Sequence, residues 1–258
     1  MERILIGRDG WIVTVTLNNP AKLNALDERM WTALGTAMRE LSADDGVRCV
    51  VLRGAGDRAF AAGADISEFA RERADSTQAR RYGALIHKTM QAVARCKHPV
   101  IAMIKGACVG GGLEIAAMCD LRICSEESRF GVPIKNLGLT MAYGELQGLL
   151  ALAGRAVTLE ILLEGRVFDA HEALQKRLVN RVVPDAEVER ETYALAQRIA
   201  DGAPLVARWH KQFIERLNAT VHVPEREWDE GYACFDTEDY RIGIASFLAK
   251  TPPRFVGR

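Results

Sequence analysis

The chain has 258 residues, of which 48% are hydrophobic and 26% are charged, the usual balance of a folded globular protein. This composition excludes extensive disorder, collagen-like repeats and small disulfide scaffolds, and a chain of this length can bury a core of its own. The 34 Lys and Arg residues equal the 34 Asp and Glu residues in number, so no basic excess indicates a nucleic-acid partner.

The N-terminus and the six cysteines indicate a cytoplasmic protein. Residues 1–10 lack the apolar core of a signal peptide. The longest apolar run, residues 146–152, is shorter than the roughly 20 residues that span a membrane, so we expect no membrane partner. The cysteines lie mostly in apolar runs, form no Cys-x-x-Cys pair and have no His at zinc-ligand spacing. We therefore expect small buried thiols in a reducing compartment and no bound metal.

The first half of the chain alternates between strand and helix patterns. Two predicted strands, residues 4–7 and 11–17, flank an Asp-Gly step that favours a hairpin. Apolar residues at helical spacing predict a helix over 26–41, and a β-branched run predicts a buried strand over 47–52. The elements expected next are a helix over 84–96, a strand over 99–104, a helix from about 111 and a strand over 121–124.

The second half is mainly helical. Residues 130–140 are expected to form a structured loop, and residues 179–183 a last strand. The expected helices are 146–153, 157–163, 171–176, 186–202, 204–218 and about 237–249. We therefore predict an α/β core domain over residues 1–200 and a helical region over residues 201–258.

Two glycine-rich segments, residues 54–66 and 106–114, each follow a buried strand, where glycines let the backbone approach a ligand closely. If a helix begins near Gly111, its first N–H groups have no acceptor inside the helix and can hold an anion or a developing oxyanion. Glu114, three residues later, shares that helix face. One helix turn then offers a backbone donor and a carboxylate for chemistry beside a carbonyl, unless Glu114 is merely an acid favoured in a first helical turn.

Several other catalytic motifs are missing from the sequence. The glycines lack the spacing of a dinucleotide or phosphate-binding loop, and no G-x-S-x-G elbow is present. The five histidines include no H-E-x-x-H pair, so we interpret each as a surface or core residue.

The sequence resembles the enoyl-CoA hydratase/isomerase (crotonase) superfamily over nearly its whole length. The matching segments are LNNPAKLNAL at 17–26, AFAAGADI at 59–66, GACVGGGLEIAAMCD at 106–120, FGVPIKNLGL at 130–139, LLEGRVFDAHEA at 162–173 and LVNRVVP at 178–184. The resemblance implies a crotonase (ClpP-like) spiral of repeated ββα units followed by a helical trimerisation region. It also implies an acyl-CoA thioester substrate that brings its own coenzyme A, no further cofactor, and a homotrimer or dimer of trimers.

The resemblance places the family's two oxyanion-binding N–H groups on Ala64 and Gly111. The family's coenzyme A-binding segments match Lys22, Leu23, Ala62, Ala64, Asp65, Ile66 and Gly111 in this chain. Lys22 is an equally good solvent-exposed lysine.

Family hydratases use two glutamates, and only the first, at Glu114, is present here. The second position holds Ile134, which weakens the case for simple hydration because water addition needs both a base and an acid. Glu145, in the segment where some isomerases place an acid, is a candidate substitute; the alternatives are a charge in a first helical turn or an intersubunit ion pair. Tyr143 is expected either to donate a hydrogen bond in the acyl site or to fill it.

Four arginines, Arg71, Arg73, Arg80 and Arg81, lie in a charge-dense stretch that is either a solvated helix face or a contact for coenzyme A phosphates. The leading prediction for the whole protein is hydration of a 2-enoyl-CoA. The alternatives are Δ3-Δ2 isomerisation, decarboxylation or thioester hydrolysis in the same site, and an acyl-CoA-binding protein of weak activity.

Overall fold

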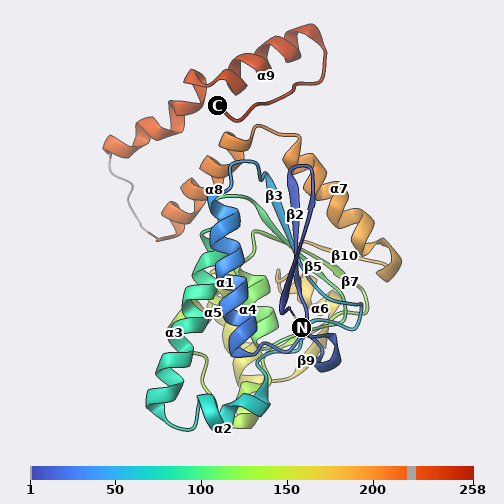
Figure 1. The fold of residues 1–258 in the computed structure, drawn as a ribbon, viewed down its shortest axis with the longest axis vertical. Helices are drawn as coiled ribbons and strands as arrows, with labels where there is room; N and C mark the ends of the chain where they lie inside the picture. The colour runs from blue at the N-terminus through green and yellow to red at the C-terminus, as the bar shows by residue number, and fades with distance from the viewer. Residues whose placement is uncertain (1, 220–224) are drawn as a thin grey trace.

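The computed structural model describes residues 2–219 and 225–258, and a six-stranded sheet lies at its centre (Figure 1). The strand order is β1-β2-β3-β5-β7-β10. The strands are β1 (Ile4–Asp9), β2 (Ile12–Leu17), β3 (Cys49–Gly54), β5 (Val100–Ile104), β7 (Leu121–Ser125) and β10 (Arg181–Val183). The first two strands pair antiparallel, as the Asp9-Gly10 step predicts, and the other neighbours pair in parallel.

A second sheet of four short strands runs β4-β6-β8-β9. Its strands are β4 (Ala59–Ala61), β6 (Ala107–Val109), β8 (Arg129–Gly131) and β9 (Val167–Asp169). A strand of the large sheet, a strand of the small sheet and a helix follow one another three times along the chain. This repetition confirms the predicted crotonase spiral of ββα units. The sequence did not indicate β4, β6 or β9, because three residues in glycine-rich or charged surroundings show no strand period.

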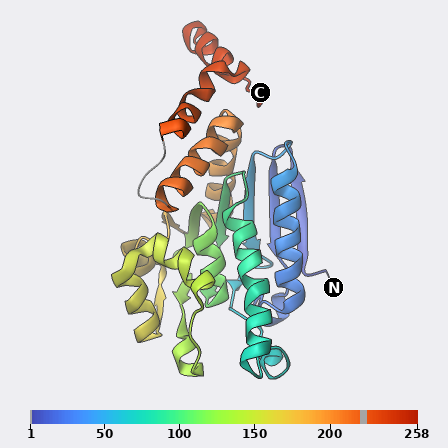
Figure 2. The same cartoon turned by 90° about the vertical axis from the view of Figure 1, so that its left-hand side faces the viewer.

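Helices cover both faces of the large sheet. Helices α1 (Glu28–Ala43) and α3 (Ser76–Ala94) lie side by side against one face, and α7 (Val188–Ala200) covers the other (Figures 1 and 2). Successive residues of a strand point to opposite faces. Accordingly, Val50 and Leu52 belong to the large core under α1 and α3, whereas Cys49 and Val51 belong to the smaller core under α7. Five of the six cysteines are buried and all six are unpaired, as the apolar context predicts.

Two helix boundaries differ from the sequence prediction. Helix α3 begins at Ser76 rather than near residue 84, because the Asp75 side chain accepts hydrogen bonds from the backbone N of Thr77 and Gln78, both at 2.8 Å. A short helix, α2 (Phe69–Glu72), precedes it. The predicted loop at 130–140 contains β8 and a 3-10 turn, Pro133–Leu137.

The predicted helices 146–153 and 157–163 are joined in one element, α5 (Tyr143–Glu164). Contrary to the expectation from the sequence, α5 is long and apolar enough to cross a membrane when judged by length and composition alone. Its backbone leaves the helical conformation at Gly154 (φ 73°, ψ 172°), so α5 consists of two shorter helical segments. Leu149 and Thr158 are buried in the protein, and the side chain of Met118 packs against Gly148.

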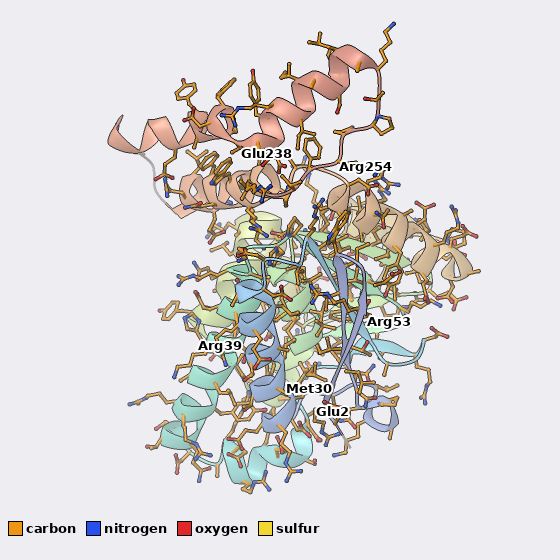
Figure 3. The ribbon with its side chains drawn as sticks, turned by 45° about the horizontal axis from the view of Figure 1, so that its top comes forward. Glu2, Met30, Arg39, Arg53, Glu238 and Arg254 are labelled. Carbon is orange, nitrogen blue, oxygen red and sulfur yellow. The ribbon has the colours of Figure 1, made fainter. Side chains whose placement is uncertain are left out.

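The chain ends in a helical region that projects beyond the sheets, marked by Glu238 and Arg254 in Figure 3. After α6 (Ala170–Gln175) and α7, this region contains α8 (Pro204–Ala219), a 3-10 segment (Glu225–Asp236) and α9 (Glu238–Ala249). The buried Arg48 side chain ties the end of the chain to the core, donating from Nη2 to the Phe255 carbonyl at 2.7 Å. The division at residue 200 stays a prediction.

Candidate active site

Two backbone N–H groups meet where β4 and β6 end. They belong to Ala64 and to Gly111, the first residue of α4 (Gly111–Met118). Each follows a glycine with a positive φ, Gly63 at 101° and Gly110 at 53°, a conformation that residues with a side chain rarely adopt. A Cβ atom built on Gly111 would lie 3.7 Å from the Ala64 nitrogen, and neither N–H donates to any acceptor among the described residues. The structure therefore brings together the two donors that the sequence resemblance implied.

Close backbone packing fixes the first turn of α4. A Cβ atom at Gly112 would lie 2.2 Å from the carbonyl oxygen of Ala61 in β4, so a side chain cannot be placed there without moving the helix. On the neighbouring side, Leu26 and Trp31 pack against Gly111, within 3.1 and 3.3 Å of where its Cβ would be. The donor position is therefore set by contacts from α4, β4 and α1 together.

Glu114 lies in the first turn of α4, as predicted, and is only 7% exposed. No hydrogen bond from the described residues reaches its carboxylate. Burial raises the pKa of Glu114 to about 8; the charge of Glu145 also raises this pKa, and the charge of Arg73 lowers it. A carboxyl group with a pKa in this range can hold and release a proton near neutral pH.

The structure gives Glu145 features of two of the roles considered for it, a charge at the start of a helix and a second carboxyl group near Glu114. Its side chain accepts a hydrogen bond from the Ala142 backbone N at 2.9 Å, which is the helix-start role. Its charge also acts on Glu114, which places it close to the predicted acid. Ile134 packs against the large core, so the family's usual second acid position holds an apolar side chain. Tyr143 is 93% exposed and therefore does not fill the site.

The residues predicted to bind coenzyme A surround the approach to Ala64. Lys22 Nζ contacts Asp65 Oδ2 at 2.6 Å and Ser67 Oγ at 3.1 Å. Leu23 accepts a hydrogen bond from the Ala62 backbone N at 3.0 Å, which joins the two predicted binding segments. Ile66 is 58% exposed beside them. Direct contacts therefore join these positions to one another, and their contact with coenzyme A remains a prediction.

The arginine-rich stretch divides into outward and inward side chains. Arg71 and Arg81 are exposed and pair with Glu72 at 2.7 Å each. Arg73 instead lies over two aromatic rings, with Cζ 4.6 Å from the Phe69 centroid and 4.5 Å from the Tyr82 centroid. These arginines could not be told apart from the sequence, because charge spacing alone does not reveal which side chain turns inward.

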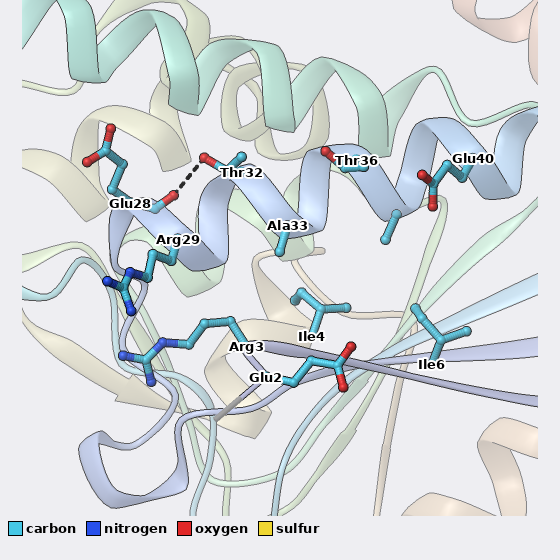
Figure 4. Close-up of a pocket in the computed structure, with 11 residues that line it drawn as sticks. Glu2, Arg3, Ile4, Ile6, Glu28, Arg29, Thr32, Ala33, Thr36 and Glu40 are labelled. Atoms are coloured by element: carbon cyan, nitrogen blue, oxygen red, sulfur yellow. Dashed lines mark hydrogen bonds between the residues drawn. The ribbon is translucent and has the colours of Figure 1, made fainter.

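An open groove of about 560 Å³ lies between β1 and α1, apart from the predicted site residues (Figure 4). Its lining includes Arg3, Ile6, Arg29 and Glu40 but none of the residues that the sequence selected. Across the described part of the chain, no group of three His, Cys, Asp or Glu side chains is placed to hold a metal ion.

Comparison with known proteins gives a consistent result. Residues 7–258 match the family model described as enoyl-CoA hydratase/isomerase. The chain is 33% identical over 252 residues to a short-chain-enoyl-CoA hydratase of Clostridium acetobutylicum, covering 97% of this chain and 96% of that one. It is 31% identical to a crotonyl-CoA hydratase of Syntrophomonas wolfei, covering 100% and 99%. The crystal structure of an enoyl-CoA hydratase/carnithine racemase from Magnetospirillum magneticum superposes with a TM-score of 0.98 at 50% identity, covering 100% and 97%.

Proposed function

The chain belongs to the enoyl-CoA hydratase/isomerase family, and from that membership and the site geometry we propose that it adds water to the C2=C3 double bond of 2-enoyl-CoA thioesters. The observation that carries this proposal is the first turn of α4, which holds an unpaired backbone N–H and a buried carboxyl group beside the N–H of Ala64.

The two N–H groups provide the electrostatic part of the reaction. When water adds at C3, negative charge develops on the thioester oxygen as C2 becomes nucleophilic. Donors fixed by the Gly63 and Gly110 backbone need no reorganisation to stabilise that charge.

The two carboxyl groups divide the proton transfers. Glu114, whose pKa is raised by burial, delivers a proton to C2. Glu145, in the more exposed first turn of α5, accepts the proton that water loses as its oxygen attacks C3. Two carboxyl groups in environments this different can act as acid and base in the same step. Glu145 would then replace the acid that is missing at Ile134.

The test is incubation of the purified protein with crotonyl-CoA, followed by the mass of the product. We expect a gain of one water, and a rate lowered by about 10²- to 10⁴-fold in Glu114→Gln, because the amide cannot transfer the proton. A product of unchanged mass with a shifted double bond would indicate isomerisation instead. Release of free coenzyme A would indicate thioester hydrolysis. Decarboxylation requires a separate incubation with a 2-carboxyacyl-CoA, because crotonyl-CoA has no carboxylate to lose.

We further infer that the chain assembles with copies of itself as a homotrimer or dimer of trimers, and needs no cofactor beyond the coenzyme A of its substrate. Large apolar side chains in the C-terminal region and on α5 support assembly, because they are exposed in the single chain; they include Leu163, Leu217, Phe247 and Leu248. Light scattering coupled to size-exclusion chromatography distinguishes the monomer from the two assemblies.

A further inference from the structure

Arg73 has no acidic partner among the described residues, and its guanidinium lies over the rings of Phe69 and Tyr82. Glu72 accepts from Arg71 and Arg81, and Glu68 accepts from Arg71 at 3.2 Å and from the Glu28 backbone N at 2.9 Å. No hydrogen bond or ion pair from the described residues reaches the Arg73 guanidinium, and its buried Nε–H has no acceptor. A buried donor without an acceptor costs free energy, so its persistence calls for a ligand.

Two further donors without acceptors lie along the same side of the site. Tyr82 is 3% exposed and Trp31 is fully buried, and neither the Tyr82 hydroxyl nor the Trp31 indole N–H makes a hydrogen bond among the described residues. Burial raises the pKa of Tyr82 to about 12, and the Trp31 N–H, which is directed at the Tyr82 hydroxyl, opposes that rise. Three neighbouring side chains, on α1, α3 and the segment before α3, thus carry polar hydrogens with no acceptor within hydrogen-bonding geometry among the described residues.

These donors adjoin the reaction centre. The Trp31 ring packs against Gly111, the oxyanion donor, and the Tyr82 ring contacts the Arg73 guanidinium. The charge of Arg73 is also felt at Glu114. A row of neighbouring side chains, Trp31, Tyr82 and Arg73, therefore leads away from the Gly111 N–H and ends in a cation.

We propose that Arg73 is a specificity-determining residue that binds a carboxylate at the far end of the acyl group, so that the preferred substrate is a monothioester of an unsaturated dicarboxylic acid. This inference rests on the proposed hydration of enoyl-CoA thioesters and names its substrate class. The planar guanidinium matches the two oxygens of a carboxylate, and the Tyr82 hydroxyl can donate to a remaining lone pair of those oxygens. A neutral alkyl chain would leave the Arg73 guanidinium without an acceptor.

The first experiment compares matched substrates with the wild-type protein. We expect kcat/KM for trans-2-enedioyl-CoA thioesters of five to eight carbons to exceed that for neutral 2-enoyl-CoA thioesters of equal length, by about 10- to 100-fold for at least one length, the usual range for a charge-assisted hydrogen bond. Equal or higher kcat/KM for the neutral member of every pair would overturn the proposal.

The second experiment removes the cation. In Arg73→Gln, kcat/KM for the preferred dicarboxylic substrate should fall about 10- to 100-fold, while kcat/KM for the neutral substrate stays within a few-fold. Arg73→Lys keeps the charge and loses the planar guanidinium, so its kcat/KM for the dicarboxylic substrate should lie between those of the wild type and Arg73→Gln. Arg198→Gln, an exposed arginine at the end of α7, is the matched control and should change neither value. An equal loss on both substrates in Arg73→Gln would show a purely structural role and contradict the proposal.

A binding measurement separates this inference from the proposed reaction. Calorimetric titration with the saturated thioesters glutaryl-CoA and butyryl-CoA requires no catalysis, and tighter binding of glutaryl-CoA that disappears in Arg73→Gln is expected even if the protein catalyses another reaction. If the protein hydrates crotonyl-CoA but binds glutaryl-CoA no more tightly than butyryl-CoA, the proposed function stands and the proposed carboxylate subsite is contradicted.

Discussion

The first turn of α4 and the α2–α3 segment border the same site, but they contribute to it through different parts of the chain. At α4 the working groups are backbone N–H donors and one carboxyl group, and they are held by close contacts of Gly111 and Gly112 with α1 and β4. At α2–α3 they are the side chains of Arg73 and Tyr82, held by ring contacts and ion pairs of their neighbours. In the functions proposed above, the first arrangement would serve any acyl-CoA thioester, whereas the second would distinguish one acyl group from another.

After the loss of activity expected for Glu114→Gln, the largest effect on activity should come from removing a backbone donor of α4. Gly111→Pro deletes its N–H at the first helical position, where proline is tolerated. We expect kcat to fall by a further 10²- to 10³-fold, about 3–4 kcal/mol of transition-state stabilisation, relative to Gly111→Ala, which adds a similar Cβ but keeps the N–H. Steady-state kinetics with crotonyl-CoA measure this difference. Equal activity of the two variants would contradict a role for the N–H.

The next effect concerns the second carboxyl group. Glu145→Gln should lower kcat by about 10²-fold if Glu145 is the base, whereas Tyr143→Phe, at an exposed neighbour, should not. Loss of the Glu145 charge also removes one cause of the raised Glu114 pKa. Hydration that needs Glu114 protonated declines as the pH rises through that pKa, so the alkaline limb of the kcat/KM profile should move to lower pH. If the alkaline limb of the profile stays at the same pH in Glu145→Gln, the charge of Glu145 does not act on Glu114.

Replacing Glu114 should stabilise the folded protein moderately, although it lowers the activity. A buried carboxyl with a raised pKa takes up a proton on folding, so the stability of the protein falls as pH rises from the ordinary value of 4.5 towards 8. Glu114→Gln needs no proton. Its free energy of unfolding should exceed that of the wild type by roughly 1–3 kcal/mol at pH 8, and by less at pH 4. Urea denaturation at the two pH values tests this, and a variant less stable at pH 8 would contradict it.

The smallest effect is expected at the surface predicted to bind coenzyme A. Lys22 is half exposed, so its ion pair with Asp65 adds little to stability. Lys22→Met should raise KM for crotonyl-CoA a few-fold and leave kcat unchanged, because the lost contact is the same in substrate and transition state. A changed kcat with an unchanged KM would place Lys22 in the chemistry instead.

The two regions also differ in how much of their structure could be predicted from the sequence. The helix start at Gly111 and the position of Glu114 were predicted, because helix-start signals and helix-face geometry act over a few residues, whereas the pairing of Ala64 with Gly111 was implied only by the resemblance to the family. The inward turn of Arg73 was not, because its orientation depends on rings from α2 and α3 that come together only in the folded chain.

By itself, the sequence determined the family, the alternation of strands and helices, the buried thiols and the first turn of α4, since each is a local pattern of apolar spacing, glycine position or motif. Only the tertiary structure decided two further features: the short second sheet, and the influence of Glu145 and Arg73 on Glu114. The short strands exist only through pairing with distant segments. The pKa of a carboxyl group likewise depends on burial and on charges that neighbouring elements bring to it.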